Sequence, residues 1–142
     1  MKSEHPDHHR NPHSIGELAV RFRDLLGKTP IECGPGWYAP LLELFSYLFA
    51  AGVRGTRQHA SRTTANSVRF LRPMEPSVLQ VKEKLGGLRV YLSASTPETE
   101  RAIRWVEHVC AETCDQCGNP GRLRRLGGQL ATRCEAHLMG IR

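Results

Sequence analysis

Apolar residues recur at helical spacing in two segments near the N-terminus. The first begins after a capping box formed by Ser14 and Glu17 and ends at Gly27. The second covers residues 37–51, follows a turn at 33–36 and is closed by Gly52, as is typical of a helix C-terminus. Both predict amphipathic helices, and the second is the more hydrophobic, so we expect it at the centre of the core. The apolar positions are Ile15, Leu18, Ala19, Phe22, Leu25 and Leu26 in the first segment, and Trp37, Leu41, Leu44, Phe45, Leu48 and Phe49 in the second.

Between residues 78 and 94 the apolar positions alternate, which predicts a β-hairpin. Gly86 and Gly87 have the composition of a two-residue turn. Closing the turn there creates an inner face that is apolar except for Glu83, whose role stays open between an edge carboxylate with a basic partner and a functional carboxylate. A slip of one residue would bury the charges of the other face, so the register is well specified. The predicted pairs are Leu85 with Leu88, Glu83 with Val90, Val81 with Leu92 and Leu79 with Ala94, and the opposite face carries Gln80, Lys82, Lys84, Arg89, Tyr91 and Ser93.

A third helix is predicted from residue 97 to about residue 112. Thr96 supplies the N-cap hydroxyl, Pro97 occupies the first turn, and Glu98 and Glu100 lie near the positive end of the helix dipole. We expect this helix to cover the hairpin and to lead directly into Cys114. Its apolar side contains Ile103, Val106, Val109 and Cys110, with Trp105 beside them.

The strongest chemical signal is a CxxC pair followed, after sixteen residues, by a CxxH pair: Cys114, Cys117, Cys134 and His137. Three thiolates and an imidazole suit the borderline softness of Zn²⁺, and each two-residue spacing lets two side chains of one tight turn coordinate the same ion. Four protein ligands complete a tetrahedron and leave no position for an activated water. The pattern therefore predicts a structural zinc site. Cys110 lies one helical turn earlier and is interpreted as a buried small hydrophobe because only Cys114 completes the spacing.

A second hairpin is predicted between the two ligand pairs. Residues 123–126 and 129–132 flank Gly127 and Gly128, and the second ligand pair enters a short terminal helix. This layout is typical of a zinc ribbon or a treble clef. The sequence therefore predicts an α+β protein with two N-terminal helices, an antiparallel hairpin packed by a third helix, and a C-terminal zinc lobe. The expected divisions are a His-rich tail at 1–13, an α+β body at 14–113 and the zinc lobe at 114–142.

Composition and charge indicate the cellular compartment in which the protein works. The chain has 142 residues, a net charge of +6 and five cysteines, four of them close together. That cysteine usage favours metal in a reducing compartment over disulfides. Since no apolar run approaches the roughly 20 residues that span a bilayer, and the His-rich start lacks a signal-peptide core, we expect a cytoplasmic protein with no membrane partner.

Arginines gather in two places, a loop at residues 53–76 and the zinc lobe. No acidic residue lies between Phe45 and Met74 or between Asp115 and Glu135. Planar guanidinium groups suit phosphates and acidic protein surfaces, so these residues are candidates for binding a partner, although a solvated loop explains the first cluster equally well. The candidates are Arg54, Arg57, Arg62, Arg122, Arg124 and Arg125.

Three stretches together resemble a family of small bacterial and phage proteins of unknown activity. They are Cys33-Gly34-Pro35-Gly36-Trp37, the segment QVKEKLGGLRVY at 80–91, and CDQCGNPGRLR at 114–124 with the final CxxH. The family pattern has phenylalanine where this chain has Leu85 and Val90, and tryptophan near Leu130. The resemblance implies no activity, but it implies a phage or mobile-element setting in the cytosol of a bacterial host, where proteins of this size commonly bind host machinery.

Three functions are compatible with these residues. We expect a non-enzymatic, zinc-stabilised interaction protein, an inhibitor or regulator of a host machine such as transcription or antiviral defence. The alternative is direct binding of DNA or RNA by the arginines, which predicts a steep loss of affinity with salt. An enzyme is the third, but the deaminase, nucleophile-elbow and phosphate-loop motifs are absent, and Cys33 has no histidine near it in sequence. The partner, the oligomeric state and the roles of Cys33, Cys110 and Glu83 stay open.

Overall fold

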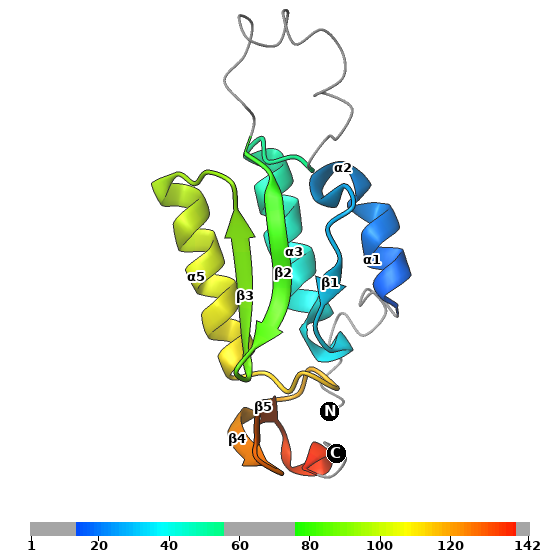
Figure 1. Ribbon diagram of the computed structural model, residues 1–142, viewed down its shortest axis with the longest axis vertical. Coiled ribbons are helices and arrows are strands. Elements are labelled where there is room, and N and C mark those ends of the chain that lie inside the picture. Colours follow the sequence, from blue (N-terminus) through cyan, green and yellow to red (C-terminus); the bar gives the residue numbers. More distant parts are fainter. Residues whose placement is uncertain (1–13, 56–75, 139–142) are drawn as a thin grey trace, which may run out of the picture.

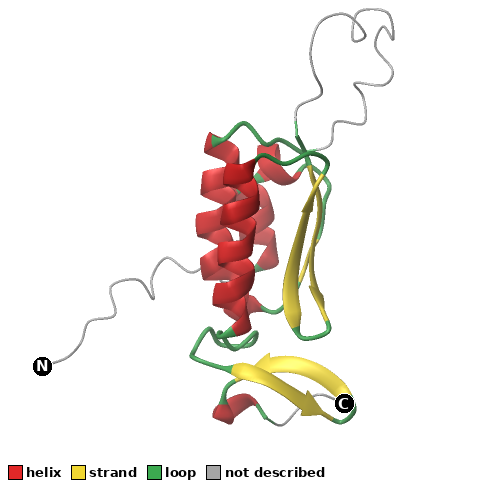
Figure 2. Cartoon of the chain, turned by 90° about the vertical axis from the view of Figure 1, so that its left-hand side faces the viewer, coloured by secondary structure: helices red, strands yellow, loops and turns green. Residues whose placement is uncertain are grey.

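The protein forms a two-layer body with a small lobe beneath it (Figure 1). The computed structural model describes residues 14–55 and 76–138, so the predicted tail at 1–13 and most of the predicted arginine loop lie outside the described residues. In Figure 2 the helices cover one face of the main sheet, and the second hairpin lies at the lower end of both layers. The predicted combination of helices with antiparallel strands is confirmed.

The first predicted helix is broken into two. Helix α1 spans Ile15–Arg21 and α2 spans Arg23–Leu26, with Phe22 between them at φ −111° and ψ 33°. Ser14 caps α1 as predicted, because its hydroxyl accepts a hydrogen bond from the Glu17 amide at 3.2 Å. The Phe22 ring packs edge-on against the Phe45 ring, with the ring centroids 5.4 Å apart. The break therefore occurs where the chain bends onto the next helix.

Helix α3 spans Tyr38–Ala50 and follows a single 3₁₀ turn, Pro35–Trp37. Ala51 is its C-cap, and Gly52 follows at φ 91°, the left-handed conformation expected of a glycine just after a helix. The prediction that this segment forms the centre of the core is confirmed. The fully buried side chains of this region are Trp37, Leu41, Leu44, Phe45 and Leu48.

The main sheet has the order β1-β2-β3. Strand β2 spans Val78–Lys84 and pairs antiparallel with β3, Gly87–Leu92. Strand β1, Ile31–Glu32, pairs parallel with β2 and was not predicted. Two residues are too few for an alternating pattern to identify a strand.

The predicted register of this hairpin is wrong by two residues. The turn consists of Leu85 and Gly86, with φ 52° and 86°, and Lys84 pairs with Gly87. A tight two-residue turn of the primed type needs positive φ at both positions, and here a leucine occupies the first of them. Leu88 consequently pairs with Glu83, where the prediction paired it with Leu85.

A two-residue shift keeps the two faces of the hairpin in place, since side chains alternate with a period of two. Val81, Leu88 and Val90 accordingly face the core as predicted. The ends of the inner face differ. Leu85 lies in the turn and is 71% exposed, while an irregularity between Val78 and Gln80 buries Val78 and leaves Leu79 49% exposed.

Glu83 is exposed and closes the turn. Its Oε1 accepts a hydrogen bond from the Gly86 amide at 2.6 Å. The carboxylate therefore stabilises the hairpin's own turn, and its role as an edge carboxylate or a functional carboxylate stays open.

Helix α5 spans Pro97–Ala111 and packs against β3 and α3. The Thr96 hydroxyl caps it by accepting a hydrogen bond from the Thr99 amide. The Thr99 hydroxyl in turn accepts one from the Thr96 amide at 2.8 Å. Val106 and Cys110 are fully buried, as predicted. Trp105 is 45% exposed, so it does not cover the hairpin.

The second hairpin is confirmed. Strands β4, Arg122–Leu126, and β5, Gln129–Arg133, pair antiparallel around Gly127 and Gly128. The predicted terminal helix is a single 3₁₀ turn, η3, Glu135–His137. Within residues 14–55 and 76–138, no helix is long and apolar enough to cross a membrane.

Candidate metal centre

The four predicted ligands meet in one cluster. Their ligand atoms all lie within 4.8 Å of one another. His137 Nδ1 is 3.6 Å from Cys114 Sγ and 3.3 Å from Cys134 Sγ, and Cys117 Sγ is 3.6 Å from Cys134 Sγ. One pair precedes the second hairpin and the other follows it, so the hairpin's pairing brings the two pairs together. The arrangement is compatible with a metal site.

The first ligand pair is held in a tight knuckle. The Gly118 amide donates to the Cys114 carbonyl at 3.0 Å, and the Cys114 amide donates to the Asn119 carbonyl at 2.7 Å. Gly118 has φ 82°, which a residue with a Cβ adopts at a cost. This is the unusual backbone that the sequence predicted after a CxxC pair.

The surroundings of the two thiols in this knuckle differ. Burial raises the pKa of Cys114, but hydrogen bonds from the backbone at Cys134, Gln116 and Cys117 outweigh it and lower the pKa to about 6. Burial and the neighbouring sulfurs raise the pKa of Cys117 to about 11, because a second thiolate beside the first is repelled. A cation at the centre of the cluster would stabilise both thiolates.

The other two cysteines lie outside the cluster. Cys110 is fully buried in the core, and Cys33 is partly buried against it. Burial raises the pKa of each thiol to about 12, so both stay protonated at neutral pH. The preference for Cys114 over Cys110 as the ligand agrees with the cluster that forms.

We expect Cys33→Ser to retain a full equivalent of bound metal, because its sulfur is not among the clustered ligand atoms. Metal per chain, measured by elemental analysis after extensive dialysis, checks this. A Cys33→Ser protein that folds but has lost its metal would show that the ligand set includes Cys33.

The described part of the C-terminal lobe, residues 114–138, is called the metal lobe below. It is joined to the body at the turn that precedes α3. The Gly36 amide donates to the Asp115 carbonyl at 2.8 Å, and Trp37 Nε1 donates to the Thr113 carbonyl at 2.8 Å. A Cβ on Gly36 would meet the Cys114 carbonyl and lie 2.7 Å from the Gly118 amide nitrogen. Gly34 and Gly36 were interpreted as residues of the turn at 33–36, but the backbone of the metal knuckle also touches both of them. Sequence reasoning missed this contact, and the two glycines beside a tryptophan were its only signal.

The tip of the main hairpin forms a second joint. Thr132 Oγ1 donates to the Gly86 carbonyl at 2.6 Å in a fully buried contact. A Cβ on Gly86 would meet Leu123 Cδ1 and lie 3.2 Å from the Ala131 amide nitrogen. Residues 33–37, the tip of the main hairpin and the first ligand pair with β4 therefore all take part in the two joints between the body and the metal lobe.

An ion pair and several arginine contacts tie the lobe together. Arg133 Nε lies 2.6 Å from Asp115 Oδ1, with the two side chains 12% and 10% exposed, although the N–H is not aligned for a hydrogen bond. Arg124 Nε donates to the Arg133 carbonyl at 3.0 Å, and its Nη2 lies 3.0 Å from Glu135 Oε1. Arg124 thus stabilises the lobe's own backbone beside the second ligand pair.

The candidate partner-binding arginines are not equivalent. Arg57 and Arg62 lie outside the described residues. Arg54 donates to the Phe49 and Val53 carbonyls at 2.8 Å each, and its guanidinium lies 4.0 Å from the centre of the Phe49 ring, so it caps the end of α3. Arg122 and Arg125 are exposed on β4. A role for these residues in binding a partner stays a prediction.

Comparison with known proteins finds no match among family models, curated proteins or solved structures.

Proposed function

We propose that this chain is a non-enzymatic, zinc-stabilised interaction protein that binds a partner protein. The observation that carries the proposal is a hollow on the helical face, between α3 and α5, that leaves Tyr47 and Trp105 44% and 45% exposed beside apolar Leu44 and Ala102. Exposed aromatic side chains beside an apolar floor are the usual anchors of protein interfaces. Burial raises the pKa of the Cys33 thiol, which weighs against this cysteine as a nucleophile because the thiolate is the reactive form.

The metal in this proposal is Zn²⁺ in a lobe of zinc-ribbon or treble-clef type. Zn²⁺ at about 2.3 Å from sulfur and about 2.0 Å from nitrogen separates neighbouring tetrahedral ligands by about 3.5 to 3.8 Å. Three of the separations between ligand atoms, 3.6, 3.6 and 3.3 Å, agree to within a few tenths of an ångström, and all four atoms lie within 4.8 Å of one another. Three sulfurs and one nitrogen also suit this ion better than Mg²⁺ or Ca²⁺, which prefer oxygen. The zinc would supply stability and no chemistry.

The setting in the proposal rests on the resemblance to bacterial and phage proteins. A small accessory protein that inhibits or regulates a host machine, in transcription or antiviral defence, needs only a stable scaffold and an exposed binding surface. Both are features of this chain, and the host cytosol supplies the reducing conditions in which thiolates hold zinc.

Nucleic acid is the second candidate partner, and one observation favours it. Lys82 lies directly opposite Arg89 in the register of the main hairpin, and both alternate with the buried Val81, Leu88 and Val90, so their side chains face away from the core. Like charges in that position repel each other, and within residues 14–55 and 76–138 the sheet register places one carboxylate, Glu32 on β1, beside Lys82. Together with Lys84, these side chains could accept phosphates.

Capture from a bacterial lysate by the zinc-loaded protein, with and without nuclease, separates the two candidates. A single protein that survives nuclease treatment and is lost with Trp105→Ala supports the protein partner. Capture that disappears with nuclease, falls steeply with salt and is lost with Lys82→Glu/Arg89→Glu contradicts it and assigns the chain to nucleic acid.

A further inference from the structure

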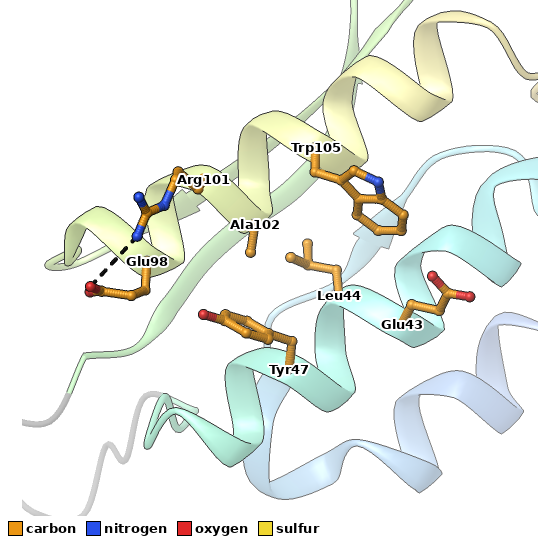
Figure 3. Close-up of a pocket in the computed structure, with 7 residues that line it drawn as sticks. All are labelled: Glu43, Leu44, Tyr47, Glu98, Arg101, Ala102 and Trp105. Atoms are coloured by element: carbon orange, nitrogen blue, oxygen red, sulfur yellow. Dashed lines mark ion pairs between the residues drawn. The ribbon is translucent and has the colours of Figure 1, made fainter.

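The hollow between α3 and α5 has the form of a groove along two antiparallel helices (Figure 3). Its volume is about 400 Å³. Leu44 from α3 and Ala102 from α5 form the floor, and the rings of Tyr47 and Trp105 rise on opposite sides. Such a space accepts a few apolar side chains, which is how an amphipathic helix binds to a groove.

Carboxylates mark the two ends of this groove. Glu98 lies at the Tyr47 end, and Glu43 lies at the Trp105 end. Glu43 is the only charged residue of α3, is exposed, and has no ion pair or hydrogen bond from its side chain within the described residues. Glu98 has a surface pair with Arg101 at 3.7 Å, of the kind that contributes little, and its carboxylate also accepts hydrogen bonds from its own backbone amide and from the Thr96 hydroxyl. The groove is also lined by Arg101, so its three charged side chains leave it with a net negative charge on a chain of net charge +6.

We propose that this groove binds an amphipathic helix of the partner protein, with two adjacent apolar side chains between Tyr47 and Trp105 and a lysine or arginine at each end, facing Glu98 and Glu43. The inference rests on the proposed function and specifies the chemistry of the partner.

The spacing of the partner's charges follows from helix geometry. Glu98 and Trp105 are seven residues apart on α5, which is about 10 Å along the axis at 1.5 Å per residue. A partner helix lying along the groove covers the same length between its positions i and i+7. The matching pattern has cations at i and i+7 and apolar residues at i+3 and i+4, which lie on one face.

A synthetic peptide carries the test. The probe is an Ala- and Gln-based peptide of about 16 residues, long enough to form a helix, with the pattern Lys-x-x-Leu-Leu-x-x-Lys. The control peptide has the same sequence with glutamate in place of both lysines. The chain has two tryptophans, of which Trp37 is fully buried, so iodide quenching of the fluorescence reports on Trp105.

The full-length, zinc-loaded protein is expected to bind the lysine peptide with a protected Trp105 and to bind the glutamate peptide at least about fivefold more weakly. Glu43→Lys should reverse this preference. Glu112→Lys, which makes the same charge change at an exposed position on the C-terminal side of α5 and outside the groove, should leave both affinities unchanged.

Equal affinity for both peptides, or a preference that Glu43→Lys leaves unchanged, would overturn the inference. So would a Trp105 that iodide cannot reach in the free protein, since a second copy or another part of the chain would then cover the groove. If these results accompany nuclease-resistant capture of a host protein, the proposed function stands and its surface lies elsewhere. Capture that depends on nucleic acid would remove both proposals together.

Discussion

Replacing Cys117 or His137 with Ala is expected to unfold the metal lobe and to loosen the body as well. Structural zinc contributes on the order of 10 kcal/mol in small metal domains, and both residues belong to the single ligand cluster. Once the knuckle opens, the Trp37 indole N–H and the Gly86 carbonyl lose the Thr113 and Thr132 partners that they bind in the native fold. The body should therefore melt at a lower temperature than in the wild-type protein.

Metal content and hydrogen exchange test this result. Loss of metal should accompany rapid exchange in β4 and β5 and faster exchange at the end of the main hairpin. Cys33→Ser serves as the control because it removes a cysteine without touching the cluster. Full metal stoichiometry in both Cys117→Ala and His137→Ala would refute the ligand assignment. Rapid exchange confined to residues 114–138 would refute the coupling to the body.

Gly36→Ala is expected to have the second largest effect. The new methyl group would meet the Cys114 carbonyl, and it would lie 2.7 Å from both the Asp115 carbonyl carbon and the Gly118 amide nitrogen. These are backbone atoms of the metal knuckle and cannot rotate away as a flexible side chain can. We expect a loss of about 3 kcal/mol in the free energy of unfolding, at the upper end for overpacking.

Gly16→Ala is the matched control for this substitution. Gly16 lies in α1, where an added methyl group comes only to 3.8 Å from Ser14 Oγ. Alanine favours a helix over glycine, so this change should stabilise the protein by up to about 1 kcal/mol. Chemical denaturation of both zinc-loaded variants gives the comparison. A Gly36→Ala protein as stable as Gly16→Ala would mean that the knuckle does not press against this turn.

Features set by local spacing could be predicted from the sequence. The ligand pairs, the caps of α1 and α5, and the second hairpin follow from residues within a few positions of one another. The core helix was also evident, because its apolar stripe is long and continuous.

Features that depend on distant contacts could not be predicted. The hairpin register depended on whether the turn begins at Leu85 or Gly86, and glycine composition favoured the wrong choice. Gly86 lies in the turn at positive φ and also touches the metal lobe, through a contact 46 residues away in the sequence. Likewise, the pattern of α5 gave no reason to expect Trp105 in an open groove, since helical periodicity does not say which neighbour a flanking residue meets.

The hydrogen bond from Trp37 to Thr113 spans 76 residues, and this separation affects how the chain is made. During synthesis the turn before α3 emerges early, whereas the Thr113 and Asp115 carbonyls that it binds emerge much later, and the Thr132 carbonyl that the Asp115 amide binds emerges later still. Contacts so distant in sequence form slowly because the intervening chain must first be ordered. The joint at this turn therefore stays incomplete until the second ligand pair has been made, and a metal ion held by the four clustered side chains would then complete it.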